Sequence, residues 1–234
     1  MKNEIAKIII IFLDIDGVVF YNPMDGTVQN RVKESFQGRE HELELSYSNY
    51  ECTKAAVDLF SVKALESLNR LIQSIKKECK VDIGIVLSSA WRERKSLQEL
   101  KELFRQHSFS EYLIDKTPED GGSRGEQITR WLNSSSDKYK VVSFVILDDD
   151  QGDLLAKFPA QLVLCNHRRL LGHDEYEKAQ MILLKQLNKE VARSTKKVKT
   201  VVLKTKKVTK TRKTIPSAKK PSKQRKTKKT TRKS

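Results

Sequence analysis

The sequence predicts an α/β fold in which a doubly wound parallel sheet carries helices on both faces. Three apolar stretches, at residues 8–13, 81–87 and 141–147, have the length of strands and few or no charged residues. Strands of this composition are typical of parallel sheets that are buried on both sides. Segments with apolar residues at helical spacing alternate with these strands, and this alternation favours a doubly wound arrangement.

The first half of the chain is predicted to contain a strand, a helix, a second strand, a second helix and a short third strand. Residues 8–13 form the first strand, and Ser61 caps a helix whose apolar residues recur at helical spacing. Residues 81–87 form the second strand. A helix follows Arg92, and a short strand lies at 112–114.

The second half continues the same alternation. Ser123 and Glu126 form a capping box, in which a serine begins a helix and a glutamate lies three residues later. Residues 141–147 form a buried strand, residues 162–165 form a further strand, and a last helix begins near Asp174.

Two regions differ in composition, and they define the expected domains. Residues 194–234, which we call the basic tail, hold 18 of the 46 Lys and Arg residues and no Asp or Glu. Residues 1–193, the body, hold the other 28 basic residues against all 30 acidic ones, although the formal net charge of the chain is +16. The Lys- and Thr-rich tail cannot bury enough apolar surface to fold, so we expect it to be disordered when free.

The composition excludes two classes of protein. Cys52, Cys79 and Cys165 are too scattered for a disulfide framework or a zinc site, which suits a reducing compartment. The sequence holds no apolar run of the ~20 residues that a membrane span requires, and the N-terminus does not read as a signal peptide. We therefore expect a soluble intracellular protein without a membrane partner.

Polar groups follow three of the apolar strands. Asp14 and Asp16 follow the first, Ser88 and Arg92 the second, and an acidic run that starts at Asp148 the third. The carboxyl ends of parallel strands lie at one edge of a sheet, where open α/β sheets bind ligands. These groups are therefore expected to converge on one site.

The order of these motifs resembles that of the haloacid dehalogenase superfamily of phosphohydrolases. Asp14-Ile15-Asp16-Gly17 fits the Asp-x-Asp-Gly motif of the superfamily, and Ser88 and the pair Asp148-Asp149 follow in the expected order. The resemblance spans roughly residues 8–153 and implies the fold of that superfamily. It also implies that the segment from about residue 20 to about residue 60 forms a flap or small cap.

The resemblance implies a phosphatase that works through an aspartyl-phosphate. Asp14 is expected to attack phosphorus, and Asp16 to protonate the leaving oxygen and then activate water. A divalent cation must neutralise the carboxylates and the phosphoryl group, and Mg²⁺ prefers such oxygen ligands. By resemblance, Mg²⁺ is bound by Asp14, the backbone carbonyl of Asp16, Asp148 and Asp149.

The remaining expected site residues bind the phosphoryl group. Ser88 is expected to hydrogen-bond a phosphoryl oxygen, and Ser89 and Arg92 to contribute to substrate binding. The superfamily also requires a basic residue between these motifs. Arg124, at the first turn of a capped helix, is the preferred candidate, and Lys116 is the alternative.

A narrower resemblance concerns the substrate. The patterns Ser-Ser-x-Trp-Arg, at residues 88–92, and Arg-Gly-Glu-x-Ile-x-x-Trp-Leu, at residues 124–132, are similar to haloacid dehalogenase-like domains associated with nucleic-acid end repair. This resemblance implies a nucleotide or polynucleotide substrate. We interpret Trp91 as core packing rather than as a platform for base stacking.

The basic tail has two alternative functions. Its lysine pairs favour non-specific binding to the phosphate backbone of DNA or RNA, and they also match nuclear localisation signals. The pairs are Lys196, Lys197, Lys206, Lys207, Lys219, Lys220, Lys228 and Lys229. The alternatives to a nucleic-acid phosphatase are a phosphatase for a small metabolite or phosphoprotein and a non-enzymatic nucleic-acid-binding protein.

Overall fold

A five-stranded parallel sheet forms the centre of the protein. The computed structural model describes residues 5–21, 60–105, 107 and 109–211, and the side chains of Leu103 and of residues 194–211 are not described. The strands are β1 (Ala6–Leu13), β2 (Asp82–Leu87), β3 (Leu113–Lys116), β4 (Tyr139–Asp148) and β5 (Leu162–Leu164), and their order is β3-β2-β1-β4-β5. All four neighbouring pairs are parallel, which confirms the predicted fold class.

The register of the sheet aligns the ends of the three central strands. Leu13, the last residue of β1, lies opposite Leu87 of β2 and Leu147 of β4. The chain adds β2 and β3 on one side of β1 and β4 and β5 on the other. The gap between β1 and β4 is therefore the point where the order of the strands reverses, and ligands of doubly wound sheets bind there.

Strand β1 is apolar throughout because both of its faces are buried. Ile9, Ile11 and Leu13 belong to one hydrophobic core, and the alternate residues, such as Ile10 and Phe12, belong to the other. Successive side chains of a strand point to opposite faces, so a strand between two helical layers needs apolar residues at every position.

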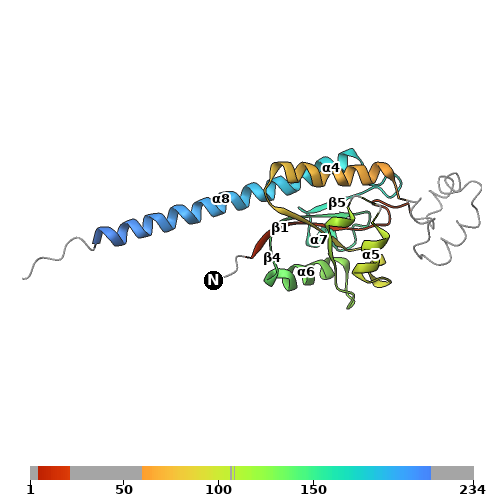
Figure 1. Ribbon diagram of the computed structural model, residues 1–234, viewed down its shortest axis with the longest axis horizontal. Coiled ribbons are helices and arrows are strands. Elements are labelled where there is room, and N and C mark those ends of the chain that lie inside the picture. The colour runs from red at the N-terminus through yellow and green to blue at the C-terminus, as the bar shows by residue number, and fades with distance from the viewer. Residues whose placement is uncertain (1–4, 22–59, 106, 108, 212–234) are drawn as a thin grey trace, which may run out of the picture. The chain divides into compact units, whose positions relative to one another are not determined.

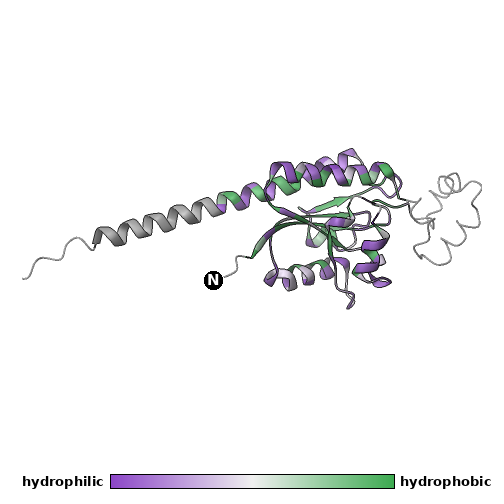
Figure 2. Cartoon of the chain, in the orientation of Figure 1, coloured by the Kyte–Doolittle hydropathy of each residue, from purple (hydrophilic) through white to green (hydrophobic). Residues whose placement is uncertain are grey.

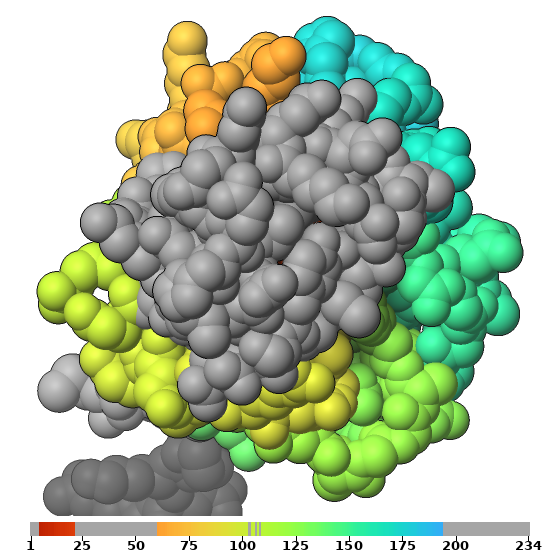
Figure 3. Space-filling view, turned by 90° about the vertical axis from the view of Figure 1, so that its right-hand side faces the viewer, coloured from red at the N-terminus to blue at the C-terminus, as the bar shows by residue number. Residues whose placement is uncertain are grey.

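Helices cover both faces of this sheet (Figure 1). The helices are α4 (Val62–Glu78), α5 (Leu97–Leu103), α6 (Arg124–Ser134), α7 (Leu154–Lys157) and α8 (His173–Thr211), with short 3₁₀ turns η1 (Ala90–Glu93), η2 (Ser110–Tyr112) and η3 (Ser135–Asp137). Helices α4, α5 and α8 contribute to the core that contains Ile9, whereas α6 and α7 contribute to the core that contains Phe12. Figure 2 shows the resulting pattern of apolar strands between helices whose outward faces are polar. Figure 3 shows α4 and the start of α8 on one side of the molecule and α5 and α6 on the other.

The expected helix caps are present. The Ser61 side chain accepts a hydrogen bond from the Ala64 backbone amide at the start of α4. Ser123 and Glu126 form both hydrogen bonds of a capping box at the start of α6. The expected flap or cap at about 20–60 lies, apart from its two ends, outside the described residues.

The boundary of the expected tail, between residues 193 and 194, stays a prediction. Helix α8 continues to Thr211, although residues from 194 onward were expected to be disordered. The segment has no glycine and no proline before Pro216, and lysine has a good helix propensity. The chain divides into two units, Met1–Val191 and Ala192–Ser234, each described here by itself.

The structure does not describe the side chains of the lysine pairs in the tail. The first two pairs, residues 196–197 and 206–207, belong to the part of α8 without described side chains, and the last two pairs lie outside the described residues. None of the helices in the described part of the chain combines the length and the apolar composition that crossing a lipid bilayer would require.

Candidate active site

Backbone hydrogen bonds hold three strand ends next to one another. The Asp14 amide donates to the Leu147 carbonyl oxygen at 3.0 Å, and the Ser88 amide donates to the Leu13 carbonyl oxygen at 2.9 Å. These bonds extend the sheet pattern by one residue beyond β1 and β2. The expected convergence of the acidic and hydroxyl groups therefore follows from the register of the sheet.

Three carboxylates meet at this edge. One oxygen each from Asp14, Asp148 and Asp149 lies within 4.8 Å of the others. Asp14 and Asp148 are buried, and Asp149 is half-buried. Gly17 makes the approach of Asp149 feasible, because a Cβ atom at Gly17 would lie 2.1 Å from Asp149 Oδ2. Gly17 also has a φ of +71°, which glycine adopts at little cost.

Burial and mutual repulsion raise the pKa values of Asp148 and Asp149. The pKa of Asp149 rises to about 6, first because of burial and then because of the charge of Asp14. The pKa of Asp148 is raised by the same two causes. Carboxylates held this close lose repulsion energy when a cation binds between them.

The donor set fits a hard divalent cation such as Mg²⁺. All three groups offer carboxylate oxygens, which Mg²⁺ prefers, and opposite ligands of Mg²⁺ lie roughly 4 Å apart at its usual bond lengths. The side chain of Asp16 does not belong to this group of three among the described residues. The coordination of Mg²⁺ by the Asp16 backbone carbonyl, implied by the resemblance, stays a prediction.

Arg124 contacts the acidic group, whereas Lys116 does not. Arg124 is the first residue of α6, and its Nη1 atom lies 3.1 Å from Asp14 Oδ2 and 2.6 Å from Asp148 Oδ2. Burial disfavours its charge, but the two carboxylates more than offset this effect and raise the pKa of Arg124. Lys116 Nζ instead donates to the backbone carbonyls of Arg92 and Lys95, at 2.8 Å each.

The Asp16 side chain does not belong to the group formed by Asp14, Asp148 and Asp149, and it has a partner that the sequence did not predict. The indole N–H of Trp91 donates to Asp16 Oδ2 at 2.9 Å, while Asp16 Oδ1 has no hydrogen-bond partner in the described part of the chain. Burial and the charge of Asp14 raise the pKa of Asp16 to about 7, although the Trp91 bond opposes that shift. A carboxyl group with this pKa exchanges protons readily near neutral pH.

Trp91 also packs in the core, as the sequence analysis predicted. Its ring forms edge contacts with Phe20 and Phe60 and stacks against Phe104. A buried tryptophan usually finds an acceptor for its N–H, and this rule is the signal that would have pointed to Asp16.

The hydroxyl groups of Ser88 and Ser89, which follow β2, differ in their hydrogen bonding. Ser88 is fully buried, and its Oγ has no hydrogen-bond partner among the described residues. Ser89 Oγ accepts a hydrogen bond from the Trp91 amide and caps η1. Of the two serines, Ser88 is thus the candidate for contact with a phosphoryl oxygen.

Arg92 does not occupy the position expected for a substrate-binding residue. Its side chain is only 4% exposed, and Nη1 donates to the carbonyl oxygens of Ser88 and Ser89. Nη2 contacts Gln127 at 2.6 Å and Glu93 at 3.3 Å. We therefore assign Arg92 to holding the Ser88–Ser89 turn, because buried backbone carbonyls need donors.

The last acids of the run at 148–153 have structural partners. Asp150 is exposed, and its carboxylate accepts from the Gly152 amide. Asp153 accepts hydrogen bonds from the Ser123 hydroxyl and the Gly125 amide. Burial is the largest single effect and raises the pKa of Asp153, but these bonds and Lys157 together outweigh it and lower the pKa to about 2. Asp153 thus stabilises the start of α6, from which Arg124 extends.

One comparison with known proteins found a match. A family model described as a HAD domain in Swiss Army Knife RNA repair proteins matches residues 10–175. The matched segment contains every described residue of the site. No curated protein and no solved structure matches the chain.

Replacing Asp149 with asparagine should weaken Mg²⁺ binding by at least about tenfold, since the change removes one charged ligand from the group of three. Isothermal titration of the folded protein with MgCl₂ measures this effect without an enzymatic assay. Asp150→Asn is the matched control, because Asp150 is the adjacent exposed acid. Equal losses for both variants would contradict the assignment of Asp149 as a ligand.

Replacing Trp91 with phenylalanine should shift the alkaline limb of the kcat/KM profile upward by roughly one pH unit, the order of magnitude of one hydrogen bond to a charged group. The indole bond lowers the pKa of Asp16, so its loss raises that pKa and keeps the acid protonated to higher pH. The assay uses a nucleoside monophosphate, because its poor leaving group requires protonation by an acid.

Trp131→Phe is the control for this experiment. The Trp131 indole is also buried, but its N–H donates to Asp115. A limb that moves equally in both variants would indicate a general effect of packing.

Proposed function

The chain belongs to the family of HAD domains in Swiss Army Knife RNA repair proteins, and from this membership we propose that it hydrolyses phosphomonoesters at the ends of nucleic acids. The observation that carries the proposal is the meeting of Asp14, Asp148 and Asp149 within 4.8 Å, with Arg124 Nη1 in contact with two of them. This arrangement suits a dianionic phosphoryl group bound with a divalent cation.

In the first proposed step, a carboxylate oxygen of Asp14 attacks phosphorus. The bond between phosphorus and the substrate oxygen breaks, and Asp16 gives its proton to that leaving oxygen. Ser88 Oγ and the Arg124 guanidinium hold the phosphoryl oxygens. Asp14, Asp148 and Asp149 would hold Mg²⁺, which would neutralise negative charge during the attack.

In the second proposed step, the carboxylate of Asp16 takes a proton from water. The hydroxide oxygen forms a bond to phosphorus, the aspartyl-phosphate bond breaks, and inorganic phosphate and Asp14 are released. A pKa near 7 lets Asp16 act as the acid in one step and as the base in the next.

Arg124 fits the role of the basic residue of the site better than Lys116 does. Its guanidinium has a planar set of donors that matches phosphate oxygens. Lys116 makes two hydrogen bonds to backbone carbonyls and an ion pair with Glu119, and it therefore has a structural role in this scheme.

We further propose that the basic tail, residues 194–234, binds the nucleic-acid substrate without sequence preference. Its 18 positive charges and lack of acids favour release of counterions from a phosphate backbone. The body, which is close to neutral, would supply the chemistry, and the tail would supply most of the affinity.

Asp14→Asn should lower turnover by roughly a thousandfold or more, because an amide cannot act as the nucleophile. Phosphate release from p-nitrophenyl phosphate and from a 3′-phosphorylated oligonucleotide, each with MgCl₂, measures the loss. Asp137→Asn, at an exposed position in η3, is the control. A folded Asp14→Asn protein with wild-type turnover would exclude Asp14 as the nucleophile.

Truncation after Arg193 should retain turnover on p-nitrophenyl phosphate and weaken binding to duplex DNA or RNA. If about six lysines engage phosphates, the affinity of the full chain for DNA should fall on the order of a thousandfold between 50 and 200 mM salt. Fluorescence anisotropy titrations at several salt concentrations measure both effects.

A full-length variant with glutamine at positions 219, 220, 228 and 229 separates the charge of the tail from its length. Its affinity should lie between those of the full and the truncated chains. Equal nucleic-acid affinity of the full and truncated chains would show that the tail is not the tether.

A further inference from the structure

A pocket lies beside the proposed acid, outside the group of metal-binding carboxylates. It has a volume of about 170 Å³ and is lined by Asp16, Ala90, Trp91, Arg94 and Lys95. This volume is below the roughly 300 Å³ at which pockets for whole drug-sized ligands begin. The pocket is therefore suited to one group of a larger substrate.

The position of Asp16 indicates which part of the substrate faces this pocket. In the proposed reaction, Asp16 protonates the oxygen that leaves phosphorus, so the leaving group lies on the Asp16 side of the phosphoryl group. Asp16 is the only one of the four site carboxylates, within the described residues, that lines the pocket. A substrate bound for reaction thus directs its leaving group toward Arg94 and Lys95.

The lining of the pocket suits an anion on that leaving group. Arg94 is exposed, Lys95 is half-buried, and both line the pocket together with Asp16. Guanidinium groups bind phosphate oxygens bidentately, and a lysine ammonium adds a point charge. The nearby acid Glu99 accepts hydrogen bonds from the Ser96 amide and hydroxyl as the cap of α5.

The segment that carries the two cations is held from both ends. Lys116 Nζ donates to the carbonyl oxygens of Arg92 and Lys95, at 2.8 Å each. At the other end, Arg92 Nη1 donates to the carbonyl oxygen of Ser89 at 2.7 Å. A binding group on a supported turn loses less freedom when the ligand binds.

We propose that Arg94 and Lys95 form a subsite for a second phosphate, the phosphodiester that adjoins the terminal phosphomonoester of a polynucleotide. This inference rests on the proposed function and names its substrate class: an end of a chain, rather than a mononucleotide. For a 3′-phosphate, the second phosphate is on the 5′ oxygen of the leaving nucleoside. For a 5′-phosphate, it is on the 3′ oxygen.

Lys116 gains a role under this proposal. It is a positioning residue that acts through the backbone of Arg92 and Lys95, and it touches neither the phosphoryl group nor the leaving group. The same residue was the alternative candidate for phosphoryl binding, and its two backbone contacts account for its place next to the site.

The test compares substrates that differ only in the second phosphate. The full chain is assayed with uridine 3′-phosphate, uridine 3′,5′-bisphosphate, a 3′-phosphorylated dinucleotide and the same dinucleotide with a neutral methylphosphonate linkage. A matching series has the terminal phosphate at the 5′ end. The result is the ratio of kcat/KM for the charged dinucleotide to that for the methylphosphonate form, so any general effect on activity cancels.

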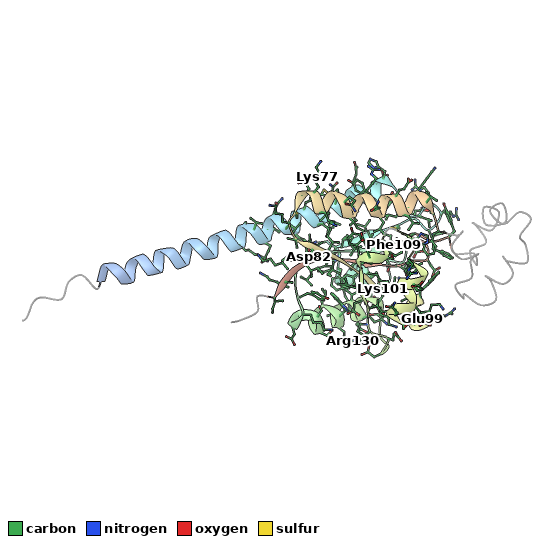
Figure 4. The ribbon with its side chains drawn as sticks, viewed as in Figure 1. Lys77, Asp82, Glu99, Lys101, Phe109 and Arg130 are labelled. Carbon is green, nitrogen blue, oxygen red and sulfur yellow. The ribbon has the colours of Figure 1, made fainter. Side chains whose placement is uncertain are left out.

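The variants are Arg94→Gln, Lys95→Gln and the double variant, with Lys77→Gln as the matched control. Lys77 is exposed on α4, and Figure 4 shows it with Asp82 at the end of the unit opposite Glu99 of α5. We expect a wild-type ratio of roughly ten or more, which is the range of one or two charge-assisted hydrogen bonds. The ratio should fall in each single variant, approach one in the double variant and stay unchanged in Lys77→Gln.

The outcomes separate this inference from the proposed function. Hydrolysis of all substrates with a wild-type ratio near one would overturn the subsite and leave the phosphatase standing. A high ratio that survives in the double variant would overturn the assignment of Arg94 and Lys95. Use of the bisphosphate but not of the dinucleotide would overturn a polynucleotide end as the substrate. If the protein hydrolyses none of these substrates and does not hydrolyse p-nitrophenyl phosphate, both the proposed function and the subsite are overturned.

Discussion

Repulsion among the carboxylates at the ends of β1 and β4 is the constraint on which the site depends. Asp14, Asp148 and Asp149 are held together by backbone register, by the missing side chain of Gly17 and by burial on the sheet edge. Burial and the charge of Asp14 raise the pKa values of the other two. Arg124 contacts two of the three, and its own charge is stabilised in return. Such a group has a strong electrostatic reason to take up a divalent cation and an anionic phosphoryl group together.

The segment from Ser88 to Lys95 connects the separate parts of the site. It contains the Ser88 hydroxyl, which has no partner among the described residues, the Trp91 indole that donates to Asp16, and the two cations of the adjoining pocket. Arg92 and Lys116, both considered as phosphate ligands from the sequence, instead donate to carbonyl oxygens of this segment. Irregular backbone beside a buried site needs such donors, because its carbonyls have no partners in a helix or sheet.

The distribution of charge along the chain agrees with the different roles proposed for the body and the basic tail. The body combines nearly equal numbers of acidic and basic residues with an acidic site, whereas the basic tail has no acid to offset its charge. An acidic site by itself repels a polyanion until a cation is bound. The proposed subsite at Arg94 and Lys95 would reward a second phosphate near the cleavage point, and the proposed role of the tail would be non-specific attraction over a longer range.

The sequence by itself determined the layers of the fold and the chemistry of the strand ends. Apolar runs such as Ile8–Leu13 specify strands buried on two faces, and the acids that follow them belong to the same short stretches of chain. Only the tertiary structure decided which basic residue faces the acids, because Arg124 and Asp14 are far apart in the sequence and meet through the packing of α6 on the sheet. The tertiary structure also decided that Trp91 donates to Asp16, 75 residues away in the sequence, and that the Arg92 side chain points inward. The direction of a long side chain depends on which buried groups near it lack partners, and those groups are known only once the elements have packed together.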